Sequence, residues 1–149
     1  MYELVFIPIA AAIAAQIVKL TIDGIPNNLN WQHLLNDYGG MPSAHAAFVA
    51  SLATVIGLSQ GFNSAVFAVS LALAIIVIRD AVGFRREIGR NAVFTNMLAK
   101  LIYADSPTQT KKKLDFLNER VGHSVLEVLI GLIFGACFSI IIYAILPIA

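Results

Sequence analysis

The residues Gly39-Gly40-Met41-Pro42-Ser43-Ala44-His45 mark the start of a long helix and decide how the chain is organised. Pro42 ends any helix that arrives from upstream, and Ser43 is a good helix N-cap. Residues 44–58 are mostly small or apolar, so we expect a helix here with His45 in its first turn. Because a helix N-terminus presents unpaired N–H groups and a partial positive charge, it suits an anion such as phosphate. His45 could donate a proton to a group held there, or it could simply face water beside a capped helix.

The composition is that of an integral membrane protein. Of the 149 residues, 58% are hydrophobic and 13% are charged, and the mean hydropathy is +0.80, which is too apolar for a soluble domain of this length. The length allows one domain, residues 1–149. The lone Cys137 lies in an apolar run, so we expect neither a disulfide framework nor a cysteine-based metal site. Nothing in the sequence indicates nucleic-acid binding.

Apolar runs long enough to cross a bilayer divide the chain. We predict an all-α, polytopic membrane helix bundle with four transmembrane helices and one amphipathic helix in the interface or under the bundle. The four spans are residues 4–22, 43–59, 65–78 with extended ends, and 123–146, and the amphipathic helix is residues 93–103. The first run has Glu3 and no Lys or Arg before it, so we interpret it as a retained helix rather than a signal peptide.

The charges predict the orientation, because all 10 Lys and Arg residues fall on one side of the four predicted spans. Lys19 ends the first span, and the others lie between Arg79 and Arg120. The positive-inside rule then places residues 23–41 and 79–122 in the cytoplasm and both termini outside. We expect the protein in the cell (plasma) membrane, with Lys111-Lys112-Lys113 solvating a loop or touching anionic lipid.

This topology brings polar residues from four span ends to one membrane face, namely Lys19, His45, Asp80, the Arg85-Arg86 pair and His123. Glu127 follows His123 by four residues, so a helix would place the two side chains on one face. The carboxylate could then hold the imidazole in the tautomer whose Nε2 is a nucleophile or base. Alternatively, Glu127 is protonated or satisfied by another helix, and His123 only begins a helix.

The other polar residues also have structural interpretations. Asp80 could form an ion pair with Arg79, and the Arg85-Arg86 pair could only anchor the topology. Lys19 could extend its side chain to the interface, and His33 is most simply a solvated loop residue.

Taken together, two histidines, a carboxylate beside one of them, a lysine and arginines fit phosphoryl transfer without a metal. Cations would hold the phosphate oxygens, one histidine would attack phosphorus, and the other would protonate the departing alkoxide. The sequence has no cluster of acidic residues for a metal, and we expect neither a metal nor another cofactor.

At these residues the sequence resembles the phosphatidic acid phosphatase type 2 superfamily, and most fully its divergent branch of small membrane proteins related to acid phosphatases and vanadium-dependent haloperoxidases. Lys19, Pro42-Ser43-Ala44-His45 and His123-x-x-x-Glu127 occur in the order of the superfamily motifs. The divergent branch is matched further by Asp80-Ala81-Val82-Gly83-Phe84-Arg85-Arg86 and by Gly122-His123 with Glu127-Val128. The resemblance implies that His123 forms a phosphohistidine and that His45 protonates the leaving group.

Three departures from the superfamily pattern concern the cations and the carboxylate. Lys19 is not followed by the expected arginine, and Leu117 occupies the position where an arginine should precede the histidine by six residues. Substitutes for that arginine are Arg85, Arg86 or Arg120. Glu127 stands where the superfamily has aspartate, which is one methylene shorter.

The sequence therefore predicts a metal-independent phosphatase that hydrolyses a lipid phosphate monoester or diphosphate at the cytoplasmic face through a phosphohistidine intermediate. The predicted site comprises the catalytic residues His123, His45 and Glu127, the phosphate-binding residues Lys19, Ser43, Arg85 and Arg86, and the supporting residues Asp80 and Arg120. The expected partners are the lipid phosphate, membrane lipids and, in a homodimer, a second copy. The alternatives are a non-catalytic scaffold or lipid-binding protein that retains the pocket and, less favoured, a vanadate-dependent haloperoxidase.

Overall fold

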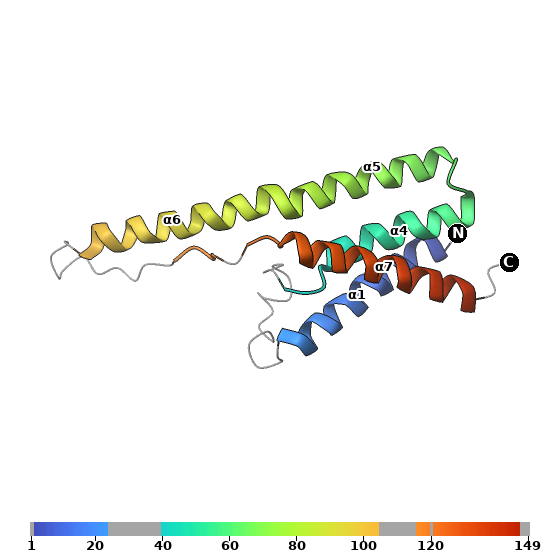
Figure 1. Cartoon of the computed structure of the whole chain (residues 1–149), viewed down its shortest axis with the longest axis horizontal. Helices are drawn as coiled ribbons and strands as arrows, with labels where there is room; N and C mark the ends of the chain where they lie inside the picture. Colours follow the sequence, from blue (N-terminus) through green and yellow to red (C-terminus); the bar gives the residue numbers. More distant parts are fainter. Residues whose placement is uncertain (1, 24–39, 105–115, 120, 147–149) are drawn as a thin grey trace.

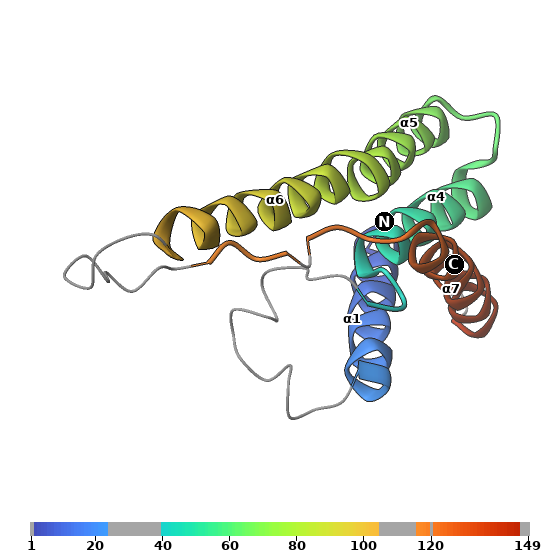
Figure 2. The ribbon, with the colours of Figure 1, turned by 60° about the vertical axis from the view of Figure 1, so that its left-hand side comes forward.

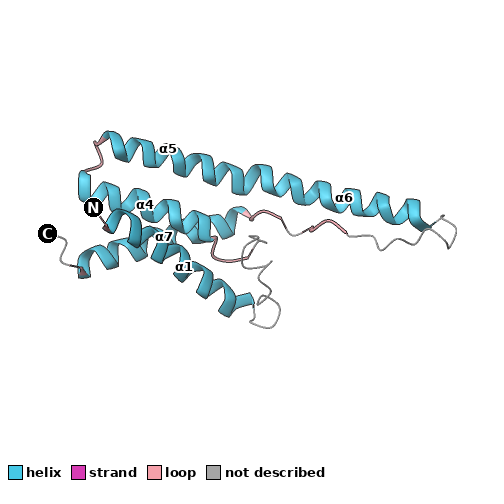
Figure 3. Cartoon of the chain, turned by 180° about the vertical axis from the view of Figure 1, so that it is seen from behind, coloured by secondary structure: helices cyan, strands magenta, loops and turns pink. Residues whose placement is uncertain are grey.

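The computed structural model describes residues 2–23, 40–104, 116–119 and 121–146. These residues form helices and no strand, which confirms the predicted all-α class. The elements are α1 (Glu3–Asp23), α4 (Ala44–Gln60), α5 (Ala65–Arg79), the π-helical turn η1 (Asp80–Phe84), α6 (Arg85–Ala104) and α7 (Val125–Ile145). In Figures 1 and 3, α1, α4 and α7 pack together, and α5, η1 and α6 form a long rod that extends beyond them.

Three helical stretches are long and apolar enough to cross a membrane, namely Glu3–Ile22, Ala65–Ile102 and Val125–Ile145. Helix α4 is a shorter apolar helix of 17 residues. Large apolar side chains are exposed on these helices, as expected for surfaces that contact lipid, among them Phe6, Ile75, Ile76, Ile133 and Ile141. That α4 completes a bundle of four spans stays a prediction.

Helices α4 and α7 lie parallel and in backbone contact. A Cβ on Gly131 would come within 2.5 Å of the Ser43 carbonyl oxygen, and one on Gly135 would collide with the backbone of Ala47. One turn further along, the Ser139 hydroxyl donates a hydrogen bond to the Ser51 hydroxyl. The contacts advance by four residues in the same direction along both helices, so both helix N-termini lie at one end of the bundle. The Gly131-x-x-x-Gly135 pattern is thus a helix-packing motif, as the sequence suggested.

The rod differs from the sequence-based expectation of two separate helices. The chain stays helical through the charged residues 79–92, and α6 begins at Arg85 instead of at residue 93. The charged residues end the apolar run but do not end the helix, because this stretch contains good helix formers and no proline. At 1.5 Å per residue the rod is about 60 Å long, roughly twice the thickness of a bilayer's hydrocarbon core. Where α6 lies relative to the membrane, in an interface or elsewhere, stays a prediction.

The start of α4, the end of α5 and the residues before α7 meet at one end of the bundle, where the pocket described below lies. Helix α1 runs from the end where α4 stops toward the end where α4 starts (Figure 1). The Ser43 N–H donates a hydrogen bond to the Glu127 carbonyl at 3.2 Å, which ties the start of α4 to α7. The His123 N–H donates to the Ala81 carbonyl at 3.2 Å, which ties the residues before α7 to η1. The predicted meeting of these ends is therefore confirmed for α4, α5 and α7.

Candidate functional site

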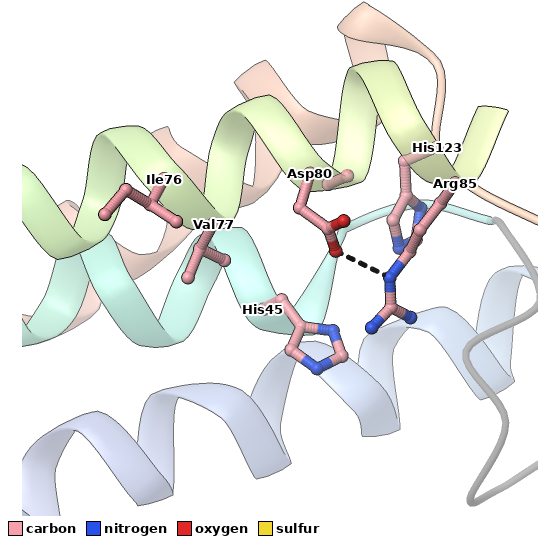
Figure 4. Close-up of a pocket in the computed structure, with 7 residues that line it drawn as sticks. His45, Ile76, Val77, Asp80, Arg85 and His123 are labelled. Atoms are coloured by element: carbon pink, nitrogen blue, oxygen red, sulfur yellow. Dashed lines mark hydrogen bonds and ion pairs between the residues drawn. The ribbon is translucent and has the colours of Figure 1, made fainter. Parts of the chain in front are cut away.

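A pocket of about 240 Å³ lies where these helix ends meet (Figure 4). It is lined by His45, Ile76, Val77, Asp80, Ala81, Arg85 and His123. The pocket residues come from α4, α5, η1, α6 and the residues before α7. They include two histidines, an arginine and an aspartate that the sequence singled out. One water occupies about 30 Å³ of liquid, so this volume has room for a phosphoryl group.

His45 reaches the pocket because α4 begins where the sequence predicts. Ser43 has an extended backbone and caps the helix, since its hydroxyl oxygen accepts a hydrogen bond from the Ala46 N–H at 3.4 Å. His45 is therefore in the first turn of α4, and its side chain is exposed. Figure 4 shows its ring and the Arg85 guanidinium group turned toward the same space.

His123 is buried and is held by a carboxylate. Its side chain is 2% exposed, and its Nδ1 lies 3.1 Å from Oε2 of Glu127. The same carboxylate oxygen accepts the Ser124 N–H at 3.1 Å, and the Glu127 N–H donates to the Ser124 hydroxyl at 3.2 Å. This reciprocal arrangement is a capping box, which fixes the start of α7. With Glu127 ionised, Nδ1 carries the proton and Nε2 carries the lone pair.

The His123–Glu127 contact has a different origin from the one that the sequence suggested. Helix α7 begins at Val125, so His123 precedes the N-cap and does not lie in the helix one turn from Glu127. Glu127 occupies the first turn, where the helix dipole favours a negative charge. The carboxylate is thus stabilised by the helix start as well as by the imidazole.

The π turn η1 aligns Asp80 with Arg85. In an α-helix, residues five apart point in directions about 140° apart, whereas a π turn accommodates one more residue and brings them closer together. The Arg85 backbone N–H bonds to the Asp80 carbonyl, and Arg85 Nε donates to Asp80 Oδ2 at 2.9 Å. The pair is partly exposed and contributes little stability by itself. Its main effect is to orient Arg85, whose terminal nitrogens point away from Asp80 (Figure 4).

Several predicted site residues do not line the pocket. Lys19 is buried on α1, and Arg86 is exposed beside Gly122. Ser43 is buried, caps the start of α4 and bonds to the backbone of Glu127. Arg120, His33 and Lys111-Lys112-Lys113 lie outside the described residues.

The apolar wall of the pocket is the part that sequence reasoning missed. Ile76 and Val77 lie on α5 four and three residues before Asp80. Since residues three and four apart share a helix face, this periodicity was the signal that could have identified them. The pocket therefore has a polar end with two imidazoles, a guanidinium group and the Asp80 carboxylate, and an apolar side on a helix whose apolar side chains are exposed. Within the described ranges, no three His, Cys, Asp or Glu residues are grouped to hold a metal ion.

The chain belongs to the divergent PAP2 family, whose model matches residues 2–138 and so includes every residue of the pocket. It is 36% identical over 142 residues to the uncharacterized membrane protein YuiD of Bacillus subtilis (strain 168), across 90% of this chain and 89% of that protein. No solved structure matches the chain. The family match confirms the resemblance identified from the motifs, and the apolar helices and the relative identify an integral membrane protein.

Proposed function

We propose that the protein is a metal-independent phosphatase that hydrolyses a lipid phosphate monoester or diphosphate through a phosphohistidine on His123. The observation that carries this proposal is the presence of two histidines in different surroundings in one pocket. His123 is buried with Nδ1 against Glu127, whereas His45 is exposed at the start of α4. Such a difference in environment suits a nucleophile and a general acid.

The reaction divides into two displacements at phosphorus. Nε2 of His123 attacks phosphorus, the bond from phosphorus to the leaving oxygen breaks, and His45 gives that oxygen a proton. A water molecule then attacks the phosphohistidine, His45 takes the water's proton, and inorganic phosphate leaves with His123 restored. The Arg85 guanidinium group and the N-terminus of α4 stabilise the negative charge on the transferring phosphoryl oxygens. Glu127 stabilises the positive charge that His123 acquires.

The remaining predicted residues have supporting roles in this proposal. Ser43 fixes the start of α4, and Asp80 orients Arg85. Lys19 and Arg86 contribute positive potential from outside the pocket, and Arg120 keeps the supporting role that the sequence predicts.

The apolar wall supports an amphiphilic substrate. Ile76 is 66% exposed and lies on a helix apolar enough to cross a membrane. A lipid can therefore keep its chain along α5 while its phosphate enters between His45, Arg85 and His123. A glycerophospholipid and a polyprenyl phosphate both meet this requirement.

The proposed location is the plasma membrane with the pocket facing the cytoplasm. This orientation is supported by the Lys and Arg residues, all of which fall on the side of the predicted spans where the pocket lies. A cysteine placed between residues 104 and 118 in a Cys137→Ala background should stay unlabelled by an impermeant thiol reagent in intact cells. Labelling without permeabilisation would contradict the proposed orientation.

The function is tested by phosphate release from a panel of lipid phosphates by purified protein in detergent, with EDTA present. We expect release to continue in EDTA and to be absent from the His45→Ala/His123→Ala variant. Loss of release in EDTA that magnesium restores would contradict the metal-independent mechanism.

A second candidate, a non-catalytic lipid-binding or scaffold protein, is favoured by one observation: Leu117 stands where the superfamily has an arginine. Saturable binding of lipid phosphates by a folded protein, without release of phosphate, would establish this candidate instead.

A further inference from the structure

The segment that carries His123 into the pocket lies along α6. This return segment, residues 116–119 and 121–123, runs beside α6 toward the bundle and ends at His123 (Figures 1 and 2). Residues 116–119 are exposed and lie in neither a helix nor a strand. The geometry of His123 therefore depends on how firmly α6 holds this segment.

Asn96 holds the far end of the return segment. Its side chain is on α6, and the residue is only 4% exposed. Its amide nitrogen donates to the Leu117 carbonyl at 2.8 Å and to Glu119 Oε1 at 2.9 Å, and its amide oxygen accepts the Leu117 N–H at 2.9 Å. The amide thus pairs with the backbone of Leu117 as both donor and acceptor.

Further contacts continue along the same face of the rod. A Cβ on Gly89 would come within 2.7 Å of the Val121 carbonyl oxygen, and one on Gly122 within 2.6 Å of the Arg86 nitrogen. Gly122 also has φ +94°, which favours glycine. The last contact is the hydrogen bond from the His123 N–H to the Ala81 carbonyl. Gly122 also lies against the Arg85 carbonyl carbon, so the contacted positions are 96, 89, 85–86 and 81. They are separated by seven, three to four and four to five residues, so the segment follows a single helix face.

We propose that Asn96 is a positioning residue for His123. Asn96 acts from a distance, since it lies about 22 Å along the rod from Ala81, the residue that bonds the His123 N–H, at 1.5 Å per residue. Asn96 fixes the start of the return segment, and the glycine contacts transmit that placement to the imidazole. The kinetic part of this inference rests on the proposed function. Because the outer side of the segment is exposed, water can satisfy the Leu117 backbone when the amide is removed. The variant should therefore loosen the segment and not unfold the bundle.

The first test is Asn96→Leu, which keeps a similar side-chain size and removes all three hydrogen bonds. We expect kcat to fall about 10- to 100-fold, because small displacements of a catalytic group are costly, while KM changes less than about threefold. The loss should be equal on lipid and aryl phosphates, since both need attack by His123. The matched control is Asn91→Leu, at an exposed position of the same helix, which should stay within about twofold of wild type. An Asn96→Leu enzyme with unchanged kcat overturns the inference.

The second test is a rescue. Asn96→Asp places a carboxylate against that of Glu119 and removes both donated bonds, so kcat should fall at least as far as in Asn96→Leu. Adding Glu119→Gln to Asn96→Asp removes the repulsion and provides an amide donor from the other side, and we expect at least about a tenfold recovery. A folded double variant that shows no recovery would contradict a role for this contact.

The third test measures the segment without using turnover. Amide hydrogen exchange should become faster over residues 116–123 in Asn96→Leu, and not in Asn91→Leu. If wild type releases no phosphate, the proposed function fails while this comparison still tests the coupling of Asn96 to His123. Faster exchange with unchanged kcat would show that Asn96 anchors the segment without positioning His123. Unchanged exchange would show that it does not anchor the segment.

Discussion

The α4–α7 pair and the α5–η1–α6 rod differ in how tightly they are packed. Helix α4 buries seven residues, from Ala46 to Gly57, whereas α5 buries only Ser70 and Ala74. The tight pair fixes the helix starts that carry His45 and hold His123 through Glu127. The loosely packed rod contributes Arg85 and the apolar wall. His45 thus belongs to the tightly packed pair, and His123 is held between that pair, through Glu127, and the rod, through Ala81. The groups proposed to hold substrate belong to the loosely packed rod.

Among the variants that test this comparison between the pair and the rod, we expect the largest loss of turnover for His45→Ala. General acid catalysis contributes about 10²–10⁴-fold, so turnover of a lipid phosphate should fall by that factor. p-Nitrophenyl phosphate has a leaving group that departs without protonation, so the variant should lose clearly less turnover on this substrate. The measurement is kcat/KM on both substrates for wild type and variant. Equal losses would reject His45 as the acid.

The rod's contribution is tested by Arg85→Ala. Removing one group that stabilises transition-state charge costs about 10²–10³-fold, and we expect a loss of this size in kcat/KM on both substrates. Arg90→Ala is the matched control, because Arg90 is exposed on α6 and paired with Glu87, and it should stay within about twofold of wild type. If the two variants behave alike, the rod does not provide the phosphate-binding cation.

Glu127→Gln tests whether the carboxylate does more than cap α7. Glutamine can also complete a capping box, so the melting temperature should change little. Turnover should nevertheless fall about 10- to 100-fold on both substrates, because the amide no longer stabilises the charged imidazole. Glu87→Gln is the control on an exposed acid. A variant with wild-type turnover would reduce Glu127 to a structural role.

The packing difference itself is tested by Gly135→Ala and Gly83→Ala. The added methyl group at residue 135 collides with the Ala47 backbone, whereas at residue 83 it meets nothing within 4 Å. Overpacking costs about 1–3 kcal/mol, so Gly135→Ala should lower the free energy of unfolding by that amount, and Gly83→Ala should not lower it. Thermal or denaturant unfolding in detergent measures both. Equal destabilisation would contradict the contrast between the pair and the rod.

Local chemistry explains which features could be predicted from the sequence. The cap at Ser43 and the spacing of His123 and Glu127 involve neighbouring residues, and the structure contains both contacts. The prediction that these helix ends lie together at one end of the bundle came from the distribution of charges and of apolar runs. Each of these features depends on a few residues close together in the chain or on a simple count of charges.

The rod could not be predicted because its features depend on helix register. Arg85 and Arg86 are equivalent in the sequence, but adjacent helical residues point about 100° apart, so one orientation of the rod selects one of them. The π turn that pairs Asp80 with Arg85, and not with Arg79, leaves no signature in hydropathy. Asn96 was missed because its partners, Leu117 and Glu119, lie more than 20 residues away in the sequence.

The most direct test of the proposed mechanism is to trap the phosphoenzyme. Wild-type protein and the His123→Ala variant are mixed with a lipid phosphate labelled in its phosphoryl group and quenched during turnover under conditions that preserve phosphohistidine. The account predicts a label on the wild-type peptide that contains His123 and none on the variant. Turnover by wild type without a phosphohistidine, or a phosphohistidine that persists in His123→Ala, would contradict it.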